Sequence, residues 1–289
     1  MTSTVLVGVS LGLFSSILFN TSYLVQHKAL DGGPNIDASH PLRSLGELFT
    51  APAWLWGGVV GLLGMAIYIL ALDYAPLSLV QAFLAGGLIL TVPLAMFISK
   101  HEPTPREVLG AGLMAAALVL FAFGTKADGP ENAFDAHGLA LLVGGALLLT
   151  MVLAFVGLRQ KYVQAVGLAA GLLYGASDAM FNALVGIAHN GLKALLESPW
   201  TWLCAVTSIG AFYLLQKAFK DGATKPVVVI ALMTAATNLT AIGAGLLVFH
   251  DPLGTNAFWS TMHLAAFGLV AYAGWLLASV QAVIEETPA

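Results

Sequence analysis

Nine apolar runs of roughly 20 residues divide the chain from end to end, and they restrict its fold more than any other feature. They lie at about 5–27, 53–72, 77–99, 106–124, 137–158, 163–188, 200–219, 226–248 and 257–280. A helix needs about 20 apolar residues to cross the hydrocarbon core of a bilayer. Hydrophobic residues make up 58% of the chain and charged residues only 9%, so one aqueous core cannot hold this sequence. We therefore expect an all-α integral membrane protein with about nine transmembrane helices.

The positive charges at the ends of these runs predict an orientation. Nine of the eleven Lys and Arg residues fall on one side of the predicted membrane, whereas Lys126 and Lys193 fall on the other. Positive residues in short loops stay preferentially in the cytoplasm. We therefore expect a multi-pass protein of the cell (plasma or inner) membrane, with its N-terminus outside and its C-terminus in the cytoplasm.

The two halves of the chain share a sequence pattern. Three pairs of short motifs recur in the same order: Phe19-Asn20 and Phe181-Asn182, Trp54-Leu55-Trp56 and Trp200-Thr201-Trp202, and His101-Glu102-Pro103 and His250-Asp251-Pro252. Their spacing changes only where the connecting loops differ in length, as expected of related units. We therefore expect a four-helix repeat at 1–124, a connecting transmembrane helix at 125–162, and a second, inverted four-helix repeat at 163–289. In transporters built from inverted repeats, the substrate site lies near the midplane where the repeats meet.

A polar face within the sixth run identifies the strongest site candidate. Asp178, Asn182 and His189 are four and seven residues apart, so they share one face of a helix. An ionised Asp at the centre of a bilayer helix costs about 3 kcal/mol on insertion scales. Such a residue usually faces a protein interior or a water-filled cavity. Asp178 is expected to bind a cation or carry a proton; the alternative is an acid satisfied structurally by Tyr174, Asn182 or a neighbouring helix.

Other polar residues are expected to line the same cavity. The repeat places Ser16 opposite Asp178 and Asn20 opposite Asn182, near the pseudo-twofold axis. The full predicted substrate- or ion-binding set is Asp178, Asn182, Asn20, Ser16, Tyr174, Gln81, Asn238 and Tyr213. Hydroxyl and amide side chains also form hydrogen bonds within and between helices, so a structural role for them stays open.

Three segments carry a family resemblance. GVSLGLFSSILFNTSYLVQHKAL, WLWGGVVGLLGMAIY and YAPLSLV, together with the nine-span plan, resemble the NIPA-type magnesium transporter branch of the drug/metabolite transporter superfamily. Glu102, Thr104, Glu107 and Gly110 are similar to the pattern that opens the fourth helix of EamA-type members. The resemblance implies alternating access around a cavity between two repeats. The third run has Gln81-Ala82 where NIPA-type proteins share a proline, so the substrate class stays open.

These observations lead to a functional expectation with alternatives. We expect a secondary transporter of small metabolites, coupled to protons or cations through Asp178. A NIPA-like magnesium transporter and a non-transporting membrane scaffold or receptor are the alternatives. No enzyme is expected, because no nucleophile-elbow or HExxH pattern occurs, and neither a cofactor nor a particular metal is indicated. The expected partners are a small-molecule or ion substrate and the lipid bilayer, without nucleic acid, and the sequence leaves a homodimer open.

Overall fold

The computed structural model describes residues 2–30, 48–90, 102–123, 133–160, 162–221 and 226–286. Its regular elements there are α1 (Ser3–Leu30), α3 (Pro52–Leu72), α4 (Leu77–Gly86), the 3-10 helix η1 (Gly87–Leu90), α6 (Pro105–Ala122), α7 (Ala136–Gln160), α8 (Val163–Ala188), α9 (Leu192–Glu197), α10 (Pro199–Asp221), α11 (Pro226–Leu247) and α12 (Ala257–Glu286). All of these elements are helical, as the sequence predicts.

In the part of the chain that the structure describes, five helices are long and apolar enough to cross a membrane. They are α3, α7, α8 and the segments Ser3–Ser22 of α1 and Ala257–Leu277 of α12. Their lengths match the roughly 20 residues that a bilayer requires. The chain is therefore a multi-pass, all-helical membrane protein.

Prolines and one capping box fix the starts of several helices. α3, α10 and α11 begin at Pro52, Pro199 and Pro226, where the missing N–H has no helical partner to lose. At α6, the Glu107 backbone N–H donates to Thr104 Oγ1 at 3.4 Å, and the Thr104 N–H donates to Glu107 Oε2 at 2.7 Å. Thr104 and Glu107, which carry the resemblance to EamA-type proteins, therefore stabilise a helix end.

The third predicted helix differs from its expected range of 77–99. α4 ends at Gly86 and the chain continues as η1, whereas residues 91–101 lie outside the described part of the structure. A side chain at Gly86 would meet Leu118 of α6 at 2.6 Å, and one at Gly87 would overlap the side chain of Ser16. Two adjacent glycines have low helix propensity and allow α1 and α6 to approach here. A single α-helix across residue 87 was therefore a wrong prediction.

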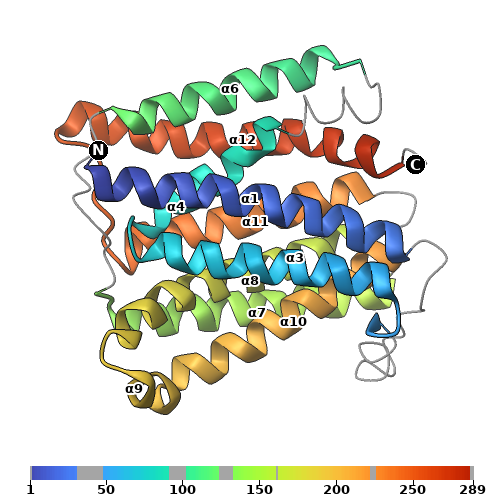
Figure 1. Cartoon of the computed structure of the whole chain (residues 1–289), viewed down its shortest axis with the longest axis horizontal. Helices are drawn as coiled ribbons and strands as arrows, with labels where there is room; N and C mark the ends of the chain where they lie inside the picture. Colours follow the sequence, from blue (N-terminus) through green and yellow to red (C-terminus); the bar gives the residue numbers. More distant parts are fainter. Residues whose placement is uncertain are drawn as a thin grey trace.

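The long helices lie side by side in one bundle (Figure 1). α1 begins at the end of the bundle where α9 lies, and α12 ends at the opposite end. α1 packs against α3 and α4, whereas α8 packs against α7, α10 and α11. α4 packs against α11 and α6 against α12, so these two contacts join the halves of the chain. The centre of the bundle therefore lies between α1, α3, α4, α8 and α11.

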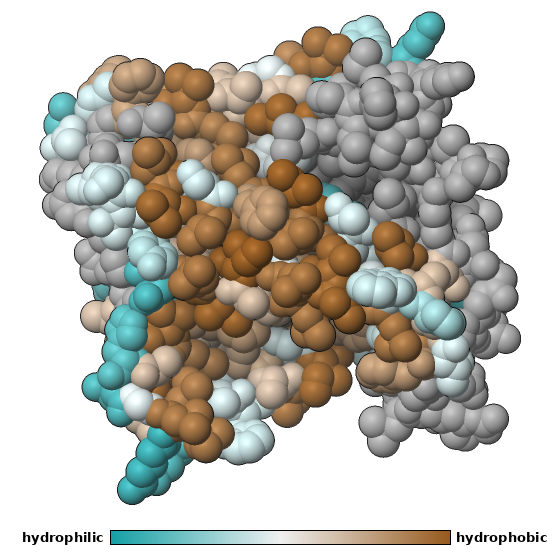
Figure 2. Space-filling model, viewed as in Figure 1, coloured by the Kyte–Doolittle hydropathy of each residue, from teal (hydrophilic) through white to brown (hydrophobic). Residues whose placement is uncertain are grey.

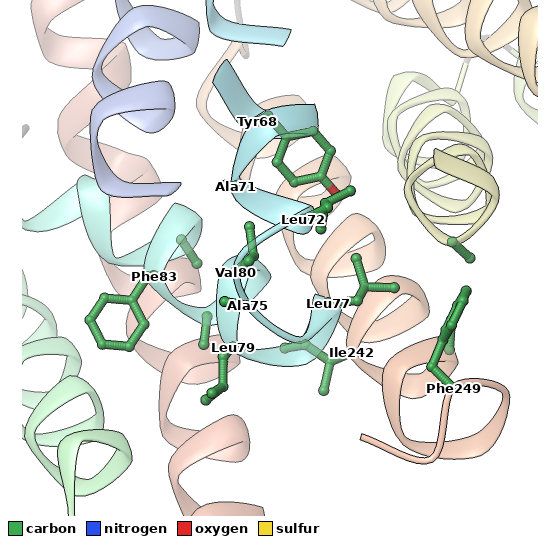
Figure 3. Packing of buried hydrophobic residues seen from close by; sticks show 14 of the residues in the cluster. Tyr68, Ala71, Leu72, Ala75, Leu77, Leu79, Val80, Phe83, Ile242 and Phe249 are labelled. Carbon is green, nitrogen blue, oxygen red and sulfur yellow. The ribbon is translucent and has the colours of Figure 1, made fainter. Parts of the chain in front are cut away.

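Apolar side chains fill the interior and also cover the outside. Figure 3 shows Tyr68, Leu77, Val80 and Ile242 converging from α3, α4 and α11 in the buried cluster. Figure 2 shows apolar residues over much of the visible face, with hydrophilic residues near the end where α9 lies. On α7, one exposed stripe consists of Leu141, Leu148 and Phe155. Such exposed apolar faces are expected of helices that contact lipid.

Candidate functional site

Close packing between α8 and α11 positions the acidic residue. A Cβ at Gly167 would lie 3.2 Å from the carbonyl oxygen of Val229, and one at Gly175 would lie 2.7 Å from that of Thr237. Thr237 Oγ1 also donates to the carbonyl oxygen of Gly171 at 3.2 Å, which ties the two helices together. Small residues spaced by four allow this approach of helix backbones. Asp178 lies one turn beyond Gly175 on α8.

Asp178 belongs to a hydrogen-bonded cluster of three residues from three helices. Gln81 Nε2 on α4 donates to Asp178 Oδ2 at 2.8 Å and to the Tyr68 hydroxyl on α3 at 2.8 Å. The Tyr68 hydroxyl also hydrogen-bonds to the carboxyl group. Tyr68 is 1% exposed and Gln81 is fully buried, whereas Asp178 is half-buried. We call this the Tyr68–Gln81–Asp178 cluster. Its hydrogen bond from Gln81 to Asp178 joins the first half of the chain to the second.

Asp178 faces a cavity of about 120 Å³ at the centre of the bundle. The described residues that line it come from α1, α3, α4, α8 and α11: Ser16, Phe19, Asn20, Met65, Tyr68, Leu84, Ala85, Tyr174, Asp178, Met233, Thr234, Thr237 and Asn238. α1 and α8 thus both contribute to the wall. Hydroxyl, amide and carboxylate groups on these residues give the cavity hydrogen-bond donors and acceptors.

The structure brings together most of the residues that the sequence singles out. The predicted residues that line the cavity are Ser16, Asn20, Tyr174, Asp178 and Asn238. Gln81 is not among the described lining residues, but it donates a hydrogen bond to Asp178. Their roles in binding remain predictions.

Two predicted site residues lie elsewhere. Asn182 is fully buried one turn beyond Asp178 and is not among the described lining residues. Tyr213 is half-buried on α10 and packs near Trp54 and Phe212. α10 packs against α8 without contributing to the described lining, so the role expected of Tyr213 stays a prediction.

Eight of the described lining residues were missing from the sequence-based set: Phe19, Met65, Tyr68, Leu84, Ala85, Met233, Thr234 and Thr237. Met65 and Met233 resemble ordinary core residues, and no pattern in their own helices distinguishes them. Phe19 belongs to the repeated Phe-Asn motif, but that motif did not indicate a place in the cavity wall. Tyr68 had a signal, because a tyrosine hydroxyl within an apolar run needs a hydrogen-bond partner when buried. That partner is Gln81, which the sequence did indicate.

Two further polar contacts join the halves at opposite helix ends. Gln216 Nε2 on α10 donates to Gln26 Oε1 near the end of α1 at 3.1 Å, and both side chains are buried. His189 Nε2 after α8 lies 2.9 Å from Asp73 Oδ1 after α3, and this pair is exposed. A second cavity of about 520 Å³ lies beside the His189–Asp73 pair. The side chain of His27, the counterpart of His189, lies outside the described part of the structure.

The described residues contain no group of three or more His, Cys, Asp or Glu side chains that could hold a metal ion. Apart from Asp178, the polar groups among the described lining residues are neutral amides and hydroxyls. An arrangement of this kind can bind a cation or exchange a proton at one carboxylate.

One comparison with known proteins gives a relative. The chain is 24% identical to the probable magnesium transporter NIPA6 of Arabidopsis thaliana over 282 residues, which cover 90% of this chain and 83% of that protein. No family model matches the chain. No solved structure matches it either.

Proposed function

We propose that the protein is a secondary transporter of small metabolites, in which Asp178 binds a cationic substrate or the coupling ion. The observation that carries the proposal is the carboxylate of Asp178 at a central cavity, held by Gln81 from the other half of the chain. An acid placed in this way marks substrate or ion pathways in membrane proteins. The similarity to NIPA6 along most of both chains supports a membrane transporter.

The proposed mechanism is alternating access by two inverted repeats, at 1–124 and 163–289, joined by the helix within 125–162. The packing of α1 with α3 and α4 has a counterpart in the packing of α8 with α10 and α11. The Gln26–Gln216 contact joins α1 to α10, and its counterpart, His189–Asp73, joins α8 to α3 at the other end of the bundle. Related contacts at opposite ends support a rocking motion that opens one end while the other closes.

Magnesium is the second candidate substrate, because NIPA6 is named a probable magnesium transporter. Mg²⁺ prefers oxygen ligands and keeps several of its waters. Asp178, with the amide oxygens of Asn20 and Asn238, would offer a sparse site for a hydrated ion.

Uptake into vesicles that contain the purified protein tests the proposed function. Under an imposed proton or sodium gradient, these vesicles are expected to accumulate at least one solute from a panel of small metabolites and magnesium, whereas empty vesicles do not. Absence of flux for every solute in the panel would contradict transport and favour a scaffold or receptor.

The proposed orientation places the N-terminus outside and the C-terminus in the cytoplasm. Asn190 and Gln160 are exposed residues beyond opposite ends of α8. In a Cys204→Ala background, Asn190→Cys is expected to react with an impermeant thiol reagent added to intact cells, because its loop lies outside. Gln160→Cys is expected to react only after the cells are permeabilised. The opposite labelling pattern would reverse the topology.

A further inference from the structure

Asp178 supplies the acidic group of the central cavity. Among its described lining residues, Asp178 is the only charged one, and none is Lys, Arg or His. Gln81 and Tyr68 form hydrogen bonds with the carboxyl group, but both are neutral. A carboxylate in a low-dielectric environment interacts strongly with a cation that enters the same space. A cationic ligand therefore fits this cavity better than an anionic one.

Aromatic rings line the same cavity. The ring centroids of Phe19 and Tyr68 are 6.5 Å apart, with 61° between the ring planes, and Tyr174 adds a third ring to the lining. Aromatic faces carry negative potential and attract ammonium groups, and aromatic cages bind alkylated ammonium ions in this way. Met65 and Met233 supply polarizable apolar surface beside these rings. The wall therefore suits alkyl groups attached to a positive charge.

The same wall suits a divalent metal ion less well. Mg²⁺ requires octahedral oxygen coordination at about 2.0–2.1 Å, and its retained waters need acceptors around them. The described lining provides one carboxylate. The other polar groups are neutral hydroxyls and amides, and five lining residues are apolar: Phe19, Met65, Leu84, Ala85 and Met233. One carboxylate neutralises a monovalent cation but leaves a divalent ion with a net positive charge in a poorly polar space. Charge and shape both favour a monovalent organic cation.

We propose that the substrate is a small organic ammonium ion, whose charge pairs with Asp178 and whose alkyl groups lie against Phe19, Met65 and Met233. The inference rests on the proposed transport function and assigns the substrate class of the same cavity. The cavity of about 120 Å³ has room for a small ligand of this kind.

Binding of tetramethylammonium to the purified protein in detergent tests this assignment. A ligand that binds only the folded state raises the melting temperature as its concentration rises. Tetramethylammonium chloride is expected to raise it, whereas sodium chloride at the same ionic strength and tert-butanol, a neutral molecule of similar shape, are not. Asp178→Asn is expected to remove the effect. Magnesium chloride that stabilises the protein while tetramethylammonium does not would overturn the assignment.

Two matched variants test the aromatic contribution. Phe19→Leu retains an apolar side chain but removes the ring, so about fivefold more tetramethylammonium is expected to be needed for the same stabilisation. Phe49→Leu is the control, because Phe49 is exposed at the surface and packs against Trp54 away from the cavity. Equal tetramethylammonium affinity in both variants would contradict binding against Phe19.

Vesicle uptake tests the transport function independently of the proposed substrate class. Tetramethylammonium binding with Asp178-dependent uptake supports both. Binding without uptake supports the ammonium site and contradicts transport of this ion. Uptake of a different solute, without tetramethylammonium binding, overturns the ammonium assignment and leaves the transport function intact.

Discussion

Asp178→Asn is expected to abolish concentrative uptake while the protein still inserts and folds. The amide has nearly the same shape as the carboxyl group, and its oxygen can still accept a hydrogen bond from Gln81 Nε2. It cannot carry the negative charge that a cationic substrate or a coupling proton requires. Removal of the charge also relieves an insertion cost of about 3 kcal/mol, so the melting temperature is expected to stay the same or rise.

The measurement pairs uptake into vesicles with a melting curve of the same preparation. Asn238→Ala is a useful comparison, because it removes a neutral polar group from the same cavity and is expected to weaken uptake without abolishing it. Wild-type uptake by a well-folded Asp178→Asn protein would defeat the role assigned to the carboxylate.

Gly175→Ala is expected to cause a large loss of stability. The added Cβ would lie 2.7 Å from the carbonyl oxygen of Thr237 and still closer to the side chain of Thr240, so the helix backbones would have to separate. Overpacking of this kind costs about 1–3 kcal/mol. A lower melting temperature in the same detergent, compared with the wild type, is the expected result.

Gly243→Ala on α11 is the matched control for this substitution. A Cβ at Gly243 meets no other atom within 4 Å, and alanine has the higher helix propensity. We expect the control to be as stable as the wild type or slightly more stable. A similar melting temperature for both variants would show that α8 and α11 are not in close contact at Gly175.

The positions of the helices could be predicted from the sequence because the bilayer sets a minimum apolar length. Val163–Ala188 is both the predicted run and the observed α8, and Pro199 and Pro226 mark helix starts through their own backbone chemistry. The end of α4 could not be predicted in this way. The break at Gly86 and Gly87 accompanies the approach of Leu118 and Ser16 from other helices, and such tertiary contacts leave no local pattern.

Some residues of the candidate site could likewise be predicted from the sequence, whereas others could not. Asp178 could be identified because a charge in an apolar run is costly and therefore conspicuous. Met65 and Met233 could not, because apolar side chains of this kind occur throughout the core of the protein. Tyr213 lies apart from the described lining for a related reason: helical spacing defines a face, but the neighbouring helix that covers that face depends on the packing of the whole bundle.

Access to the central cavity from both sides of the membrane tests the central claim most directly. Asn20 lines this cavity, and Cys204 is buried at 2% exposure, so Asn20→Cys in a Cys204→Ala background gives one reporter thiol. The reaction of a small impermeant thiol reagent is measured in right-side-out and in inside-out vesicles. Alternating access predicts that the reagent reacts with Asn20→Cys in both preparations. Reaction from one side only, in a protein that melts like the wild type, would contradict it.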